Sequence, residues 1–146
     1  MTESQSEPSN SLRYRAFISY SHKDKAIATW LHATLERYRL PNKLVGNITS
    51  VGAVPKRLSP IFRDQDELPA SGNLGTELQN ALANSLFLIV ICSPASARSK
   101  WVNEEIRQFK MLHGSDKVLA LVVDGEPNPK IEAVEHECFA PALKCV

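Results

Sequence analysis

Neither a long apolar run nor an excess of one charge is present in this sequence. The longest apolar run, residues 86–92, is far shorter than the ~20 residues that a helix needs to cross a bilayer. The 17 Lys and Arg residues nearly balance the 16 Asp and Glu residues, which argues against a nucleic-acid footprint or a membrane-binding basic face. The N-terminus also lacks the basic-then-apolar order of a signal peptide. We therefore expect no nucleic-acid partner, no membrane partner and a cytoplasmic location.

Cysteine is scarce, and the residues that commonly bind metals are not arranged to do so. The spacing of the three cysteines and four histidines matches no zinc site. Asp64, Asp66 and Glu67 lie close together, but the pattern of a calcium-binding loop is missing. Cys92 lies inside the apolar run, so we expect a buried thiol that is not a nucleophile, as in proteins of a reducing compartment. The sequence therefore predicts no metal site.

Glycine-rich phosphate loops and nucleophile motifs are absent as well. The six glycines form neither a G-x-G-x-x-G fingerprint nor a P-loop. No G-x-S-x-G is found, so the sequence lacks the nucleophile elbow of the α/β hydrolases. These absences leave few side chains that are suited to catalysis.

What the sequence does contain is an alternation of strand-like and helix-like segments, which predicts an α/β domain. Residues 86–92 are apolar on both faces and rich in β-branched residues, so we expect a strand in the middle of a parallel sheet. Further strands are predicted at residues 14–20, 59–63, 117–123 (a buried strand) and 141–146 (at the sheet edge). Helices are predicted from Ser21 or Asp24 to before Pro41, at 73–84 with Asn73 as the cap, at 99–112, and within 128–137. We expect one domain with a parallel sheet and helices on both faces.

Three segments show no regular period. Residues 1–12 are polar and serine-rich, so we expect a disordered leader before a domain at residues 13–146. Residues 94–98 are predicted to form a loop of small residues. Residues 40–58 are predicted to form a long loop, in which Lys43, Lys56 and Arg57 either approach a ligand phosphate or are simply solvated.

The predicted helix at residues 99–112 carries the strongest candidate for chemistry. Ser99 can cap it, and Val102, Ile106 and Phe109 form its buried stripe. Trp101 and Glu105 lie one turn apart on a neighbouring face, near the end at which ligands bind in open α/β sheets. Periodicity alone favours a simpler interpretation, in which Trp101 only packs and Glu105 is solvated. Glu104 lies on another face, where we expect it to interact with Lys100.

Four motifs, in order along the chain, resemble those of a bacterial Toll/interleukin-1 receptor (TIR) domain. Residues 14–21 resemble its first strand, residues 62–64 the approach to its BB loop, residues 88–93 its central strand, and residues 99–106 its S-x-W-x-x-x-E helix. The resemblance covers residues 13–146. It implies a flavodoxin-like fold, with a parallel five-stranded sheet wrapped by helices. Val102 replaces a cysteine that is common in the family, and the final helix is missing, so we expect the N-terminal module of a longer protein.

The resemblance also implies a function. Many bacterial TIR domains cleave NAD+ at the nicotinamide–ribose bond, and some cyclise the product, so NAD+ is expected as a substrate and no cofactor is implied. By this resemblance Glu105 is the catalytic residue, Trp101 lines the cleft, and Tyr20, Ser21 and Asp64 border it. We expect an NAD+ glycohydrolase or cyclase, acting as an effector in bacterial antiviral defence or as a producer of a signal.

Other members of the family only bind one another as signalling adaptors. Residues 64–75 and the helix at 73–84 would be their contact surfaces here. In many TIR enzymes the BB loop of one copy completes the cleft of another, so self-association is expected in either case. The carboxylate of Glu105 favours the enzyme, because an adaptor does not need it. A nucleotide-binding relative such as a deoxyribosyltransferase fits the four motifs less well.

Overall fold

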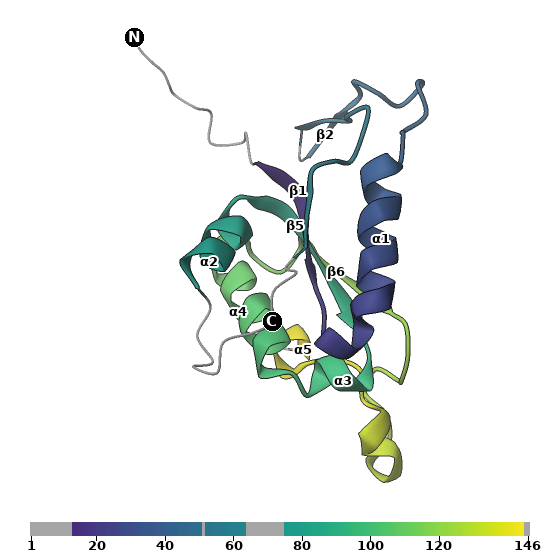
Figure 1. Cartoon of the computed structure of the whole chain (residues 1–146), viewed down its shortest axis with the longest axis vertical. Helices are drawn as coiled ribbons and strands as arrows, with labels where there is room; N and C mark the ends of the chain where they lie inside the picture. The colour runs from purple at the N-terminus through teal and green to yellow at the C-terminus, as the bar shows by residue number, and fades with distance from the viewer. Residues whose placement is uncertain (1–12, 51, 64–74, 145–146) are drawn as a thin grey trace.

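The computed structural model describes residues 13–50, 52–63 and 75–144 (Figure 1). These residues form a parallel sheet of four strands in the order β4-β1-β5-β6, and a small separate hairpin. The expected leader and the acidic segment that contains Asp64 lie outside the described residues. No helix among the described residues has both the length and the apolar composition to cross a membrane.

The prediction of a buried central strand is confirmed. The strands of the sheet are β1 (Tyr14–Ser19), β4 (Ile61–Arg63), β5 (Ser85–Cys92) and β6 (Val118–Val122). β5 pairs in parallel with β1 on one side and with β6 on the other. Its apolar residues are in contact with helices on both faces, which explains why the strand shows no alternation of polar and apolar residues.

Helices cover both faces of the sheet, as predicted. α1 (Lys25–Arg37) lies along one face, and α2 (Thr76–Ala83) and α4 (Lys100–His113) lie along the other (Figure 1). The core beneath α1 is formed mainly by Ala16, Ile18, Ala28, Ile61 and Ile91. The core beneath α2 and α4 is larger and includes Phe17, Leu82, Leu88, Val90, Trp101, Val102, Ile106 and Phe109. Successive residues of β1 and β5 alternate between these two cores.

Capping signals explain the two ends of α4 but not the start of α2. Ser99 caps α4 as predicted, because its side chain accepts a hydrogen bond from the Val102 N–H. The C-terminal cap of α4 is Gly114, with φ 87° and ψ 178°, and glycine adopts a positive φ without strain. The expected cap of α2 at Asn73 is wrong. The Gly75 carbonyl already accepts the first helical hydrogen bond, so Gly75 is the N-cap.

The prediction of a fifth strand at residues 141–146 is also wrong. Pro141–Lys144 form a short helix, α5, which packs on α4. Side chains of α4 bind the α5 backbone: Lys110 Nζ donates to the Ala142 carbonyl at 2.6 Å, and Asn103 Oδ1 accepts from the Ala142 N–H at 2.7 Å. These contacts satisfy polar groups that a strand would have paired with the sheet.

In consequence, β6 is an edge strand and is not buried on both faces as expected. Within the described residues it pairs only with β5. Leu119 is 50% exposed and Val122 is 44% exposed. A wholly apolar strand therefore lies at the rim of the sheet.

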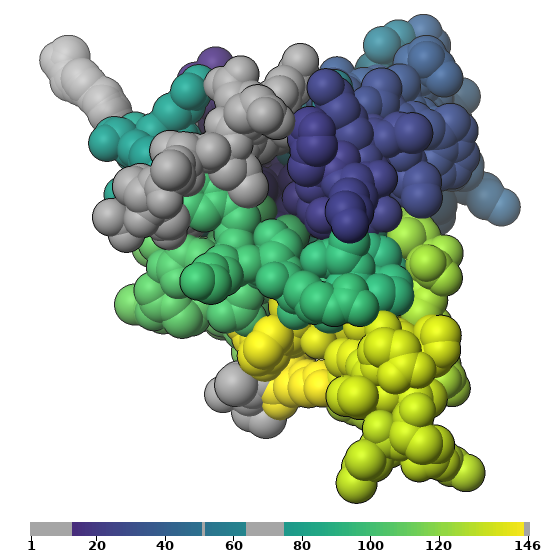
Figure 2. Space-filling view, turned by 60° about the horizontal axis from the view of Figure 1, so that its bottom comes forward, coloured from purple at the N-terminus to yellow at the C-terminus, as the bar shows by residue number. Residues whose placement is uncertain are grey.

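Two segments predicted to be loops contain regular structure. Residues 94–98 include the single-turn helix α3 (Pro94–Ala97), which begins with a capping box in which Ser93 and Ser96 bind each other's backbone N–H groups. The long segment at 40–58 contains a two-residue-per-strand hairpin, β2 (Ile48–Thr49) with β3 (Gly52–Ala53). The predicted short helix within 128–137 is a 3₁₀ helix, η3 (Ile131–His136), which projects from the body of the domain (Figures 1 and 2).

At the other edge of the sheet, side chains of α1 bind the backbone of one residue of β4. The Ile61 N–H of β4 donates to Glu36 Oε2 at 2.5 Å, and the Ile61 carbonyl oxygen lies 2.8 Å from His32 Nε2. In a parallel pair, alternate residues of an edge strand direct their backbone groups away from the neighbouring strand. The two α1 side chains take the place of a strand partner there.

Candidate active site

Glu105 is a buried carboxylate bound by the last residue of β1. It lies in the second turn of α4 and is 3% exposed. Ser19 is fully buried, and its Oγ donates a hydrogen bond to Glu105 Oε1 at 2.6 Å. The simpler interpretation, in which Glu105 is solvated, is therefore wrong. The buried face of α4 is wider than the Val102, Ile106 and Phe109 stripe and extends to the Glu105 side.

Trp101 lies one turn before Glu105 and belongs to the core. It is 6% exposed and packs in the cluster that includes Phe17 and Val90. Its indole Nε1 is buried and has no hydrogen-bond partner in the part of the chain that the structure describes. A buried donor without an acceptor is uncommon in folded proteins and costs free energy. Trp101 thus contributes packing and, in addition, an unused N–H.

Tyr20 lies at the same end of the sheet but on its other face. Ser19 points toward α4, and the next side chain, Tyr20, packs with the core beneath α1. The Tyr20 hydroxyl lies 3.4 Å from Arg63 Nη1, at the end of the neighbouring strand β4. The Arg63 Nε atom is buried and has no partner among the described residues. The structure therefore does not bring Tyr20 onto the Glu105 face, although Tyr20 follows β1 directly and the Glu105 carboxylate is bound by the last residue of β1.

Ser21 has a local structural role. Its Oγ accepts a hydrogen bond from the Lys23 N–H at 3.3 Å and caps the short helix η2 (His22–Asp24). Asp24, the other expected cap, makes no capping bond to α1. Its carboxylate instead accepts a hydrogen bond from Ser93 Oγ at 2.6 Å, which ties η2 to the end of β5. Asp64 lies outside the described residues, so its position relative to these groups is not defined.

Sequence reasoning missed Ser19 and the Asp24–Ser93 pair. Ser19 lies at the end of an apolar strand, on the same face as Phe17. A small polar residue at a position whose alternation predicts burial was the available signal. Ser93 and Asp24 gave no comparable signal, because polar residues after a strand and before a helix are ordinary turn and cap residues.

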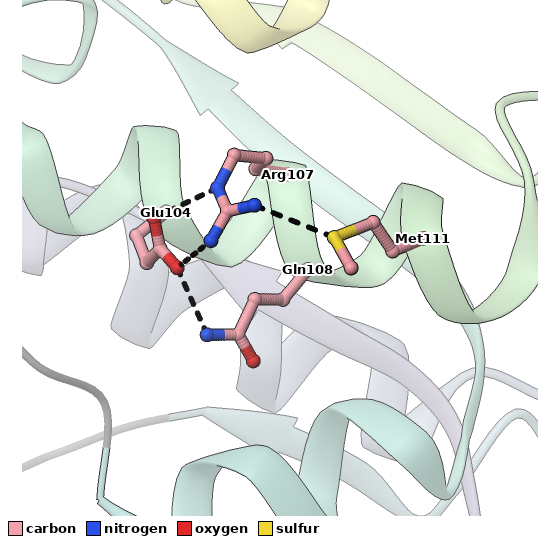
Figure 3. Close-up of polar contacts among 4 residues, drawn as sticks. All are labelled: Glu104, Arg107, Gln108 and Met111. Atoms are coloured by element: carbon pink, nitrogen blue, oxygen red, sulfur yellow. Dashed lines mark hydrogen bonds and ion pairs between the residues drawn. The ribbon is translucent and has the colours of Figure 1, made fainter.

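Glu104, the neighbour of Glu105, has a different environment. It binds Arg107 Nη2 at 2.5 Å and Nε at 3.0 Å, and it also accepts from Gln108 (Figure 3). Arg107, and not the expected Lys100, is therefore its partner. The hydrogen bond from Arg107 lowers the pKa of the Glu104 carboxyl below its usual value.

The buried cysteines are unsuited to act as nucleophiles, as expected. Cys92 and Cys138 are fully buried in the same core cluster. Burial raises the pKa of the Cys92 thiol to about 12, and the nearby Cys138 adds to this effect. Burial also raises the pKa of Cys138. Within the described residues, no group of three His, Cys, Asp or Glu side chains is arranged to hold a metal ion. Glu105 therefore stands out as the buried ionisable group of the site.

Comparison with known proteins agrees with the resemblance noted in the sequence. The NAD(+) hydrolase ApTIR of an Actinoplanes species is 36% identical over 116 residues, which is 79% of this chain. The chain spans 15% of the length of that relative. A solved structure of the TIR domains in the activated Roq1 resistosome, which directly recognises the pathogen effector XopQ, gives a TM-score of 0.48 at 20% identity. The superposition covers 75% of this chain and 55% of the resistosome chain. The sequence model of the TIR domain family matches residues 16–140, so the chain belongs to the TIR family.

Proposed function

We propose that this domain cleaves NAD+ at the nicotinamide–ribose bond and that Glu105 is its catalytic carboxylate. The observation that carries the proposal is the placement of Glu105. It is a buried carboxylate, held by Ser19 at the carboxyl end of β1, where ligands of open α/β sheets bind. Its position in the S-x-W-x-x-x-E motif and the similarity to an NAD(+) hydrolase support the choice of substrate.

The chemistry needs only one carboxylate. The C1′–N bond of NAD+ breaks, and its electron pair leaves with nicotinamide, which becomes neutral. Nicotinamide therefore needs no general acid to protonate it. The ribose is left with an oxocarbenium-like positive charge, of the type that carboxylates stabilise in glycosidases. Preorganised groups of this kind contribute ~10²–10³ in rate.

The second step sets the product. Water that adds to C1′ and loses a proton gives linear ADP-ribose, whereas attack by the adenine ring of the same molecule gives a cyclic product. We propose linear or cyclic ADP-ribose as the product class and an immune effector or signalling role for the whole protein.

The remaining site residues have supporting roles in this proposal. Trp101 lies one helical turn before Glu105, and its aromatic ring is proposed to line the substrate site. Ser21 and Asp64 are proposed to border the substrate, as the family resemblance implies, whereas the packing of Tyr20 beneath α1 leaves it on the other face of the sheet. NAD+ is the substrate, and the reaction as written uses no further cofactor or metal. Self-association of the domain, as in other TIR proteins, completes the site.

The test is to incubate the purified protein with NAD+ and separate the products by chromatography. Glu105→Gln keeps the size of the side chain and an acceptor for Ser19, so the fold is retained while the negative charge is lost. We expect this variant to lose NAD+ cleavage. Glu104→Gln is the matched control, because it makes the same chemical change one residue away at a solvent-facing ion pair, and we expect it to keep most of the activity. If Glu105→Gln is as active as the unmutated protein, the proposal is wrong and a non-catalytic adaptor is the better interpretation.

A further inference from the structure

The hydrogen bond between Ser19 and Glu105 joins two elements that are far apart in the sequence. The residues are separated by 86 positions, and both are buried. Ser19 is the last residue of β1, and β1 is paired on both sides, with β4 and with β5. Its backbone is opposite Val90 in the ladder with β5. Ser19 is thus held by the ladder with β5, at the end of a strand that is paired on both sides.

A hydroxyl in this position can control where the carboxylate lies. Glu105 has three side-chain torsions, and a free glutamate at a helix surface samples many rotamers. The Ser19 proton is donated to one carboxylate oxygen, Oε1, at 2.6 Å. Hydrogen bonds to an ionised acceptor are stronger than neutral ones and favour the charged form. The contact therefore holds the orientation of the Glu105 carboxylate.

Ser19 itself is not available to a substrate. Its side chain is fully buried, with none of its surface exposed. Any effect of Ser19 on catalysis must therefore pass through Glu105. We propose that Ser19 is a positioning residue that fixes the Glu105 carboxylate for the bond cleavage, an inference that rests on the proposed function.

A purely structural role is the alternative to be separated from this one. A buried carboxylate needs a donor to offset its loss of hydration, whether or not it reacts. A structural donor changes stability, whereas a positioning residue changes kcat. Ser85 provides a matched control. It is also a fully buried serine of the sheet, and its Oγ also donates a hydrogen bond at 2.6 Å, to the Ala81 carbonyl of α2. Ser85 is the first residue of β5, so it lies at the end of the sheet away from Glu105.

The experiment compares Ser19→Ala, Ser19→Thr and Ser85→Ala with the unmutated protein in steady-state NAD+ cleavage and in thermal melts. We expect Ser19→Ala to lower kcat by about 10- to 100-fold, as for a misplaced catalytic group, with little change in KM. Ser19→Thr keeps the hydroxyl and is expected to recover part of the lost kcat. If its extra methyl prevents folding, Ser19→Cys keeps the size and a weaker donor, and the same partial recovery is expected. Ser85→Ala should melt at a lower temperature and retain its kcat.

Two results would overturn the inference. One is a kcat for Ser19→Ala equal to that of the unmutated protein. The other is a decrease in kcat that Ser85→Ala also shows, or that the fraction of unfolded protein in the melt accounts for. In either case the Ser19 hydroxyl acts only on stability.

A measurement without turnover separates failure of this inference from failure of the proposed function. The ¹³C carboxyl resonance of Glu105 is compared at one pH in the unmutated protein, in Ser19→Ala and in Ser85→Ala. We expect the resonance to shift in Ser19→Ala, because the hydrogen bond to Oε1 is gone, and to stay in place in Ser85→Ala. If Ser19→Ala leaves the resonance unchanged, the inference about Ser19 is wrong, whether or not NAD+ is cleaved. If the resonance shifts but the unmutated protein does not cleave NAD+, only the proposed function is wrong.

Discussion

Glu104 and Glu105 are adjacent in sequence but lie in opposite environments on α4. Glu105 is 3% exposed and accepts a hydrogen bond from Ser19. The Glu104 side chain is 27% exposed and pairs with Arg107, one turn later on the same helix (Figure 3). Adjacent helical residues point about 100° apart, and this rotation is enough to place one carboxylate in the interior and the other at the surface.

The Glu104–Arg107 pair should stabilise the fold near neutral pH and lose this effect in strong acid. Arg107 lowers the pKa of Glu104 below its usual value of 4.5. A lowered pKa means that the stabilisation is present above 4.5 and is lost as pH falls through the lower folded value. We expect Glu104→Gln to be slightly less stable than the unmutated protein at pH 7, because exposed pairs contribute little. The difference should vanish at strongly acidic pH in denaturant titrations, and a difference that grows on acidification would contradict the assignment.

Trp101→Ala should reduce the free energy of unfolding by about 3–5 kcal/mol, as for other truncations of large buried aromatic residues. The indole is 6% exposed and lies in the main core cluster, so its removal leaves a cavity. Trp101→Phe is the control, because it keeps an aromatic ring and loses mainly the second ring and Nε1. Urea denaturation of the three proteins provides the measurement. A Trp101→Ala protein that is as stable as the Phe variant would show that the ring does not support the core.

Cys92 should resist alkylation in the folded protein. Burial raises the pKa of its thiol to about 12, so almost no thiolate is present at pH 8, and the thiolate is the reactive form. We expect iodoacetamide at pH 8 to leave Cys92 and Cys138 unmodified, as read by peptide mass spectrometry. The same reagent in guanidinium chloride should modify both. Rapid labelling of Cys92 under native conditions would argue against its burial.

Gly125→Ala should destabilise the loop after β6 strongly. Gly125 has φ 83°, and a Cβ atom there would lie 2.5 Å from the His136 carbonyl oxygen and 3.0 Å from Pro94 Cδ. Gly46→Ala is a matched control, because Gly46 also has a positive φ, of 91°, but nothing lies within 4 Å of its added Cβ. In both variants the strained backbone lowers the free energy of unfolding by about 1–2 kcal/mol. Only in Gly125→Ala does the steric overlap lower it further, by about 1–3 kcal/mol. Equal melting temperatures for the two variants would contradict this.

Specific NAD+ cleavage activity should rise with protein concentration. The proposal that a second copy completes the site predicts weak activity when the domain is dilute and greater activity when it is concentrated or crowded. Activity per mole is measured over a wide concentration range and compared with the mass distribution from light scattering. Activity per mole that stays constant while the mass distribution changes would show that a single copy is sufficient.

The local features of the fold were predictable from sequence because they depend on neighbouring residues. Residues 86–92 of β5 are uniformly apolar, and the Ser99 cap lies three residues before the N–H that it binds. The failures depend on tertiary contacts. Residues 141–144 are helical because Asn103 and Lys110 of α4 bind the Ala142 backbone. Apolar content alone could not show that β6 would lie at an edge.

The sequence predicted where the candidate residues of α4 lie, but it did not predict how they are held. Periodicity placed Trp101 and Glu105 together on α4, but left open whether Glu105 would be solvated. The structure buries it because Ser19, 86 residues away, supplies a hydrogen bond. Tyr20 follows Ser19 directly and lies on the opposite face of the sheet, a consequence of strand alternation that motif order does not reveal.

The two edges of the sheet differ in a way that limits how copies of the domain can join through strands. At β4, the side chains of Glu36 and His32 bind the Ile61 N–H and carbonyl groups, which an added strand would otherwise bind. At the other edge, β6 is apolar and ends the described sheet, and edges of this kind accept strands from other molecules. Two molecules that pair through β6 would form a closed pair related by a two-fold axis, whereas a sheet open at both edges can extend into a ribbon without end. The side chains of Glu36 and His32 therefore oppose the addition of a strand at Ile61, so that a strand-paired contact is favoured at β6 over β4.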